Sequence, residues 1–128
     1  MNLDLEAAKA SQEIINKTAG KKSSEVENLI TKTLGVLQEN SVYACMLYLY
    51  SRTSESDEAV SKVTRKQLIG MTILLDKNKK YDGNDKAKDV LNFLTTNICN
   101  DLDTLLLTKQ LWKQTLTYTR YGAKAREE

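Results

Sequence analysis

The chain has 128 residues, long enough for one domain with a single core, so residues 1–128 are expected to form one domain. It has no histidine, which removes the commonest general base and zinc ligand, and no proline, where average usage of about 5% predicts roughly six. With 19 Lys and Arg against 17 Asp and Glu, the net charge of +2 gives no overall electrostatic argument for nucleic-acid binding, so such an argument must rest on local clusters.

The two cysteines and the amino-terminal segment bear on the cellular compartment in which the protein is expected. Cys45 and Cys99 are each flanked by apolar residues and have no second cysteine two to four positions away, so both are predicted to be buried thiols rather than metal ligands or nucleophiles. Free buried thiols suit a reducing compartment. Residues 1–6 are acidic and lack the basic and then apolar layout of a signal peptide, so a cytoplasmic location is expected.

Apolar residues recur at spacings of three and four along most of the chain, which predicts an all-α, single-domain bundle of about six helices without strands. Asn2 is a candidate N-cap for the first helix, and Ser24 with Glu27 three residues later has the pattern of a capping box. Asn40, which tolerates a left-handed conformation, and Ser41, a fair N-cap, are predicted to separate the second helix from the third. In chain order, the expected helices cover residues 2–20, 24–37, 41–50, 59 to about 77, 85–98 and 102–125.

Residues 42–50 form the longest run without a charged or small polar residue. On a helix, their apolar side chains fall on every face, which is typical of a helix in the middle of a bundle. A strand is the alternative because Val and Tyr favour strands, but no second β-branched run is present to pair with it. The segment is too short to cross a bilayer, which needs about 20 such residues. We therefore expect the bundle to be built around this central apolar helix.

Three patterns would suggest metal binding, catalysis or DNA binding, and each is incomplete. Residues 76–87 begin like a calcium-binding loop, but they lack the Gly at its sixth position and the Glu at its twelfth. Asp101 and Asp103 are two residues apart on a helix, which points them away from each other, and Asp101 is better explained as an N-cap. A helix-turn-helix over residues 24–52 would need polar side chains on its second helix, which is apolar. We expect no metal site, no cofactor and no enzymatic activity.

Three basic clusters remain, and for each one a solvated helix face is the alternative to a binding site. The carboxyl-terminal helix has no acidic residue between Asp103 and Glu127, and it carries Trp112, Tyr118 and Tyr121 among its cations, a mixture suited to phosphate contact with occasional stacking. Trp112 is nonetheless better explained as a core residue. The candidate RNA-binding residues are Lys113, Arg120, Lys124 and Arg126 in this helix and, secondarily, Lys62, Arg65 and Lys66 in the fourth helix. The third cluster is Lys77, Lys79 and Lys80, where cations complement the end of a helix dipole.

Two segments together resemble a known protein family. Residues 34–44 (LGVLQENSVYA) join an apolar helix to a very apolar one through a turn, and residues 116–125 (LTYTRYGAKA) combine aromatic residues, Arg and an Ala-x-Ala ending. In these features the chain resembles the small all-helical subunit of type III-B CRISPR RNA-guided effector complexes, the fifth subunit of the Cmr complex. The resemblance extends in length and helix order over nearly the whole chain. Ser41 stands where the Asn-Gly turn of that family would place Gly.

The resemblance implies a non-catalytic protein present in several copies, stacked head to tail beside the backbone subunits of the Cmr complex, with a basic face that follows guide RNA and target RNA. Target cleavage in that family belongs to a backbone subunit. We therefore expect a structural subunit in antiviral defence whose cations contact RNA phosphates, which position RNA without reading its sequence. Two alternatives stay open: a helical protein–protein adaptor without an RNA role, and a metal-dependent nuclease using Asp76, Asp82 and Asp101.

Overall fold

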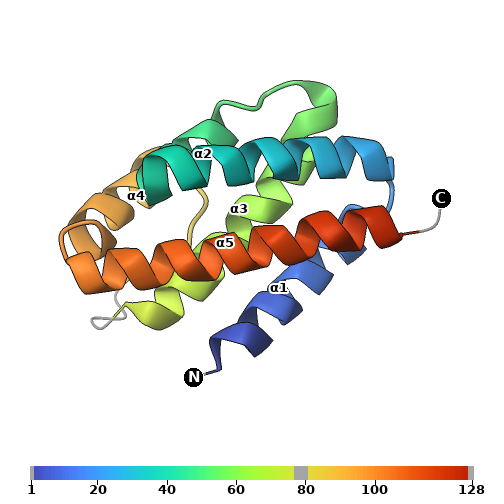
Figure 1. Ribbon diagram of the computed structural model, residues 1–128. Helices are drawn as coiled ribbons and strands as arrows, with labels where there is room; N and C mark the ends of the chain where they lie inside the picture. Colours follow the sequence, from blue (N-terminus) through green and yellow to red (C-terminus); the bar gives the residue numbers. More distant parts are fainter. Residues whose placement is uncertain (1, 77–80, 127–128) are drawn as a thin grey trace.

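The computed structural model describes residues 2–76 and 81–126 (Figure 1). The described part is helical and contains no strand, which confirms the predicted all-α class. Its elements are α1 (Leu3–Lys17), α2 (Ser23–Tyr50), α3 (Glu55–Leu75), α4 (Ala87–Phe93), the π-helical turn η1 (Leu94–Ile98) and α5 (Leu102–Ala125). These are five α-helices instead of six, because the second and third expected helices form the single element α2. The predicted cluster of Lys77, Lys79 and Lys80 lies outside the described residues.

The break expected between the second and third helices is a kink inside α2 and not a loop. Among the described residues, Ser41 is the one non-glycine with a positive φ, at φ 76° and ψ −162°. Backbone in this region is essentially restricted to glycine, because a Cβ atom collides with the neighbouring backbone. The unusual conformation was expected at Asn40 and lies one residue later. Ser41 therefore holds a strained backbone immediately before the buried Val42.

Replacing Ser41 with glycine is expected to raise the free energy of unfolding by about 1 kcal/mol, because glycine adopts this conformation without the steric cost of a Cβ atom. Part of the relief is offset by the greater freedom of glycine in the unfolded chain. Asn40→Gly is the matched control, since it places glycine in helical backbone and should lower stability by about 0.3–0.5 kcal/mol. Chemical denaturation of the three proteins measures both changes, and a Ser41→Gly variant less stable than the wild-type protein would contradict the strain at this kink.

The helix that organises the packing is α5, which crosses in front of α3 and packs along both α1 and α2 (Figure 1). Its inner face carries Trp112, which is fully buried and donates a hydrogen bond from Nε1 to Oγ1 of Thr72 on α3 at 2.8 Å. This confirms Trp112 as a core residue. Near the other end of α5, Gly122 allows a close approach of α1, because a Cβ atom at this position would lie 3.1 Å from Cγ1 of Ile15.

Residues 42–50 form the second half of α2 and are not surrounded by other helices as expected. One side is fully buried, through Val42, Cys45, Met46 and Leu49. On the other side, Tyr43 and Leu47 are 40% and 48% exposed. This half of α2 is therefore buried on one side only, although it has apolar residues on every face. Across residues 2–76 and 81–126, no helix combines the length and the apolar character needed to cross a membrane.

The helix starts agree with the predictions in part. Oδ1 of Asn2 accepts a hydrogen bond from the backbone N–H of Leu5 at 3.1 Å, which confirms Asn2 as the N-cap of α1. The predicted capping box at Ser24 is wrong, since α2 begins at Ser23 with Lys22 in the N-cap position, so Ser24 already lies inside the helix.

Candidate nucleic-acid interface

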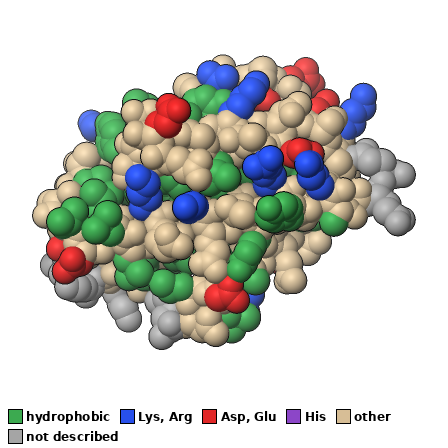
Figure 2. All heavy atoms as spheres, viewed as in Figure 1, with side chains coloured by type: hydrophobic (Ala, Val, Ile, Leu, Met, Phe, Trp, Pro, Cys, Tyr) green, Lys and Arg blue, Asp and Glu red, His purple; other side chains and the backbone are tan. Residues whose placement is uncertain are grey.

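Three of the four cations predicted in the carboxyl-terminal helix share one side of α5. Lys113, Arg120 and Lys124 are separated by whole turns of the helix, so their side chains project in similar directions. Figure 2 shows Lys and Arg side chains gathered over α5 and along its border with α2. These three residues and the neighbouring Tyr121 are called the α5 surface below.

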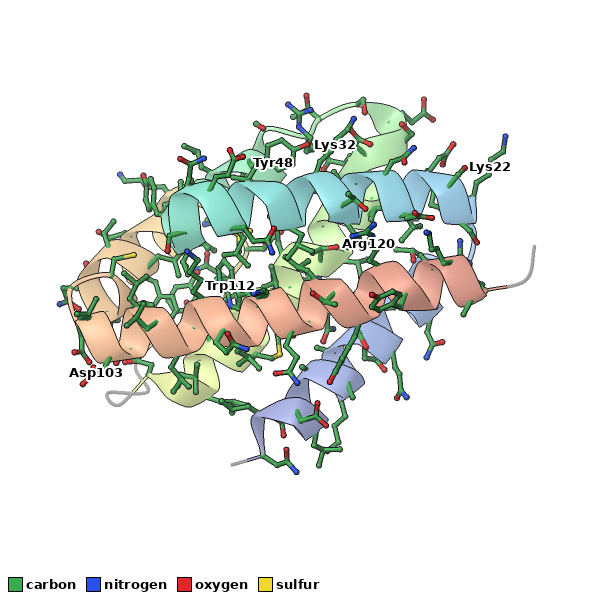
Figure 3. All side chains as sticks on the ribbon, viewed as in Figure 1. Lys22, Lys32, Tyr48, Asp103, Trp112 and Arg120 are labelled. Carbon is green, nitrogen blue, oxygen red and sulfur yellow. The ribbon has the colours of Figure 1, made fainter. Side chains whose placement is uncertain are left out.

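Arg120 lies between α5 and α2 in Figure 3 and is half-buried. Its guanidinium makes no hydrogen bond and no ion pair with any residue that the structure describes. Guanidinium offers five N–H donors in a planar fork that matches phosphate oxygens, and its charge acts more strongly in a partly desolvated position than in open water. Lys113, on the same side of α5, is exposed and likewise has no partner in the described part of the chain. Both side chains are therefore available to an external anion.

Lys124 forms an ion pair across the border between α5 and α2. Its Nζ lies 3.7 Å from Oε1 of Glu27, and the two side chains are 57% and 27% exposed. Surface pairs of this kind contribute about 0–1 kcal/mol and are screened by salt. Lys124 can therefore exchange Glu27 for a phosphate at little cost.

Of the aromatic residues singled out in the carboxyl-terminal helix, Tyr121 is placed for stacking. It is 66% exposed and lies about one helical turn before Lys124. Tyr118 is half-buried, and its hydroxyl donates a hydrogen bond to Oδ1 of Asp4 near the start of α1. Exposed aromatic rings beside cations are the arrangement that binds single-stranded nucleic acid, because unpaired bases stack on the ring while the cations contact the backbone.

Arg126 does not belong to the α5 surface, although it was predicted with the other cations. It follows the last residue of α5 and bonds to the connection between α1 and α2. Its Nη1 donates to the backbone oxygen of Thr18 at 3.0 Å, its Nε donates to Oγ of Ser23 at 3.1 Å, and its Nη2 donates to the backbone oxygen of Lys21. The guanidinium thus donates its hydrogen bonds to protein acceptors, and Arg126 joins the end of α5 to the connection between α1 and α2.

Arg65, which was predicted as a phosphate contact, is buried and bonded within the protein. It is only 7% exposed. Its Nη2 lies 2.9 Å from Oδ2 of Asp85, and its Nη1 donates to Oγ of Ser61 at 3.2 Å. The guanidinium also lies over the ring of Tyr50, with Cζ 4.2 Å from the ring centroid. Arg65 therefore joins α3 to the end of α2 and to the segment before α4.

Burial, hydrogen bonds and charge shift the pKa values of Asp85 and Tyr50, the two partners of Arg65. Burial alone would raise the pKa of Asp85, but the hydrogen bonds and charge of Arg65, with the hydrogen bond from Tyr50, hold this pKa below the ordinary value of 3.8. The pKa of Tyr50 is raised, first by burial and then by its hydrogen bond to Asp85. At neutral pH the network therefore combines a charged carboxylate, a charged guanidinium and a neutral phenol.

Lys62 and Lys66 are exposed on α3, which passes behind α5 in Figure 1. Together with Lys17, from the last turn of α1, they line a hollow with a volume of about 140 Å³. No residue of the α5 surface lines this hollow, so the two predicted clusters are separate surfaces. Sequence reasoning missed Lys17, because no local pattern connects it with a helix that follows much later in the chain.

The aspartates of the nuclease alternative do not form a metal-binding group. Asp82 accepts a hydrogen bond from the backbone N–H of Asn84 at 3.0 Å, within a turn. Asp101 occupies the N-cap position of α5, as expected, and its carboxylate accepts a hydrogen bond from Thr104. Within residues 2–76 and 81–126, no three His, Cys, Asp or Glu residues are grouped so that they could hold a metal ion. Part of the segment resembling a calcium loop, residues 77–80, lies outside the described residues.

The two thiols differ in burial. Cys45 is fully buried, as predicted, and burial raises its pKa to about 12. Cys99 is partly buried, and burial raises its pKa as well. A thiol with a raised pKa is protonated at neutral pH and is therefore a poor nucleophile.

Comparisons of the chain with models of known protein families, with curated proteins and with solved structures find no match.

Proposed function

We propose that this chain is a non-catalytic small subunit of a type III-B CRISPR RNA-guided effector complex, and that its α5 surface contacts phosphates of guide RNA or target RNA. In this proposal, copies of the chain stack beside the backbone subunits of the Cmr complex, in the cytoplasm, as part of antiviral defence. The chain holds RNA in place, and another subunit cleaves the target.

The observation that carries the proposal is the free positive charge of the α5 surface. Arg120 is half-buried and has no protein partner in the described part of the chain, Lys113 is exposed in the same situation, and Lys124 is held only by a weak surface pair with Glu27. A bundle that needed these cations for its own stability would pair them, as it pairs Arg65 and Arg126. Tyr121 adds an exposed ring beside them.

The sequence resemblance points to the same part of the molecule. Residues 116–125, the segment that resembles the closing stretch of the family, contain Arg120, Tyr121 and Lys124 of the α5 surface. One of the two segments that resemble the family thus also carries three of the four residues of the α5 surface.

In the proposed mechanism, the cations of the α5 surface offset the repulsion between the phosphates of guide and target as the two strands are brought together. Contacts to phosphates set position and orientation, whereas base pairing to the guide reads the sequence of the target. Each contact is weak and salt-dependent, so the effect comes from several cations on each copy and from several copies along the RNA.

Purification of the tagged protein from cells that produce it naturally tests the proposal. We expect RNA of uniform, guide-like length and several larger proteins to elute with it, and the protein to be present in more than one copy per complex. A preparation free of RNA, or one with a single unrelated protein partner, would contradict the effector-subunit proposal.

One observation favours the adaptor alternative. Beyond the cations, toward the amino-terminal end of α5, Leu102, Leu106 and Leu107 are 67%, 55% and 40% exposed. Exposed apolar side chains close together mark protein–protein contacts more often than RNA contacts. If a partner binds through this end of α5 with an affinity that does not change with salt, and no RNA is present, the adaptor function is the correct one.

A further inference from the structure

The hollow between α1 and α3 has a basic wall. Lys62 and Lys66 line it from α3 and Lys17 from α1, with Val63 and Gln67 completing the lining. It is called the α1–α3 hollow below. The amide of Gln67 makes no hydrogen bond with any residue that the structure describes, so it can bind a ligand together with the three ammonium groups.

The protein itself neutralises little of the charge around this hollow. Nζ of Lys17 lies 3.6 Å from Oε2 of Glu13, but the side chains are 58% and 50% exposed, and such pairs within a helix are weak. Lys62 and Lys66 form no ion pair within the described part of the chain. Glu58 lies one turn before Lys62 on α3 but is not within ion-pair distance of it, so two of the three lysines have no direct carboxylate partner in the described residues. The like charges repel one another, which favours an anion among them.

We propose that the α1–α3 hollow binds a single phosphate group. Lysine ammonium groups and an amide N–H supply donors from both helices, and tetrahedral phosphate oxygens accept several such bonds at once. The volume of about 140 Å³ is below the range of about 300–1,000 Å³ typical of sites for larger organic ligands. The hollow therefore has room for one phosphate group, and the rest of a nucleotide would lie outside it.

This phosphate belongs either to an RNA terminus, as a phosphate monoester, or to the RNA backbone, as a phosphodiester. The biological meaning of the site rests on the proposed function, because RNA would then contact the chain at the α1–α3 hollow as well as at the α5 surface. The binding of phosphate itself does not rest on it, so the two proposals can fail separately.

The test is an NMR titration of the labelled full-length chain with inorganic phosphate, with chloride exchanged for phosphate so that ionic strength stays constant. We expect the largest changes in backbone amide signals around Lys17 and around Lys62 to Gln67. The variant Lys62→Gln/Lys66→Gln should bind phosphate at least about tenfold more weakly. The variant Lys9→Gln/Lys88→Gln removes the same charge at two exposed positions that do not line the hollow, and it should bind as the wild-type protein does.

Two RNA oligonucleotides, one with a 5′-phosphate and one without, then identify the source of the phosphate. If only the phosphorylated oligonucleotide competes with inorganic phosphate, the hollow binds an RNA terminus, and equal competition by both indicates the backbone. The proposal is overturned if the signal changes are not centred on the hollow or if the two double variants lose affinity equally. If neither oligonucleotide competes, the hollow binds phosphate but the assignment of this phosphate to RNA is wrong. A third variant, Lys113→Gln/Arg120→Gln, changes the α5 surface and leaves the hollow intact. It should bind inorganic phosphate as the wild-type protein does, whether or not the α5 surface binds RNA.

Discussion

Replacing Arg65 with alanine is expected to lower the free energy of unfolding by about 3 kcal/mol and the melting temperature by roughly 10 °C. The substitution removes the guanidinium that lies 2.9 Å from Asp85 and leaves a carboxylate only 25% exposed without its counter-charge. It also removes the cation that lies over the ring of Tyr50 and the hydrogen bond that Arg65 donates to Oγ of Ser61. Thermal and chemical denaturation followed by circular dichroism measure the loss.

Arg52→Ala is the matched control for this prediction. Arg52 also lies over a tyrosine of α2, with Cζ 4.7 Å from the ring centroid of Tyr48, but it forms no ion pair in the described residues. Its removal should cost less than about 1 kcal/mol. If Arg65→Ala and Arg52→Ala lower stability by the same amount, the buried network is not the structural junction that we describe.

The cost of Arg65→Ala should depend on pH in a definite direction. Because Arg65 lowers the pKa of Asp85 in the folded protein, its stabilisation is fully present above the ordinary value of 3.8 and is lost as the pH falls through the lower folded-state pKa. The stability difference between the wild-type protein and the variant should therefore be largest near neutral pH and shrink in acid. A difference that grows on acidification would contradict the assignment.

A complex carrying the variant Lys113→Gln/Arg120→Gln is expected to bind target RNA about 10- to 100-fold more weakly at physiological salt. The slope of log affinity against log salt should become shallower by about 0.7 for each phosphate contact that is lost to single-stranded RNA. The loss should be similar for targets of different sequence, because these contacts read no bases. Filter binding or fluorescence anisotropy over a range of salt concentrations measures all three quantities.

The variant Lys9→Gln/Lys88→Gln is the control for this loss, since it lowers the net charge by the same amount at exposed positions outside the α5 surface. It should leave affinity and salt slope close to those of the wild-type complex. An unchanged slope in Lys113→Gln/Arg120→Gln, or equal changes in both variants, would show that the α5 surface does not contact phosphates.

The helices could be read from the sequence because they depend on local spacing. Apolar residues at intervals of three and four predicted most helical segments, and Asn2 and Asp101 were predicted at positions that begin helices. The kink at Ser41 was located to within one residue, but its form, a single residue with a positive φ between two helical halves, was not foreseen, because serine rarely adopts this conformation.

The candidate site could be predicted only in part, because burial of a cation depends on partners far away in the chain. Arg65 finds its carboxylate 20 residues later, and Arg126 bonds to Thr18, which is 108 residues earlier. By sequence both looked like Lys113 and Arg120, which have no such partner in the described residues. Tertiary contacts therefore decide which of the predicted cations bond within the protein and which stay available to a ligand.

The measurement that tests RNA contact at the α5 surface most directly is photochemical crosslinking in the complex purified through this chain, with mass spectrometry to locate the crosslinked residues. We expect RNA to be crosslinked to Tyr121 and its neighbours on α5, because this ring is exposed and lies about one helical turn from Lys124. Crosslinks only at tyrosines outside α5, such as Tyr43 or Tyr81, or none on this chain while other subunits of the same complex are crosslinked, would contradict the account.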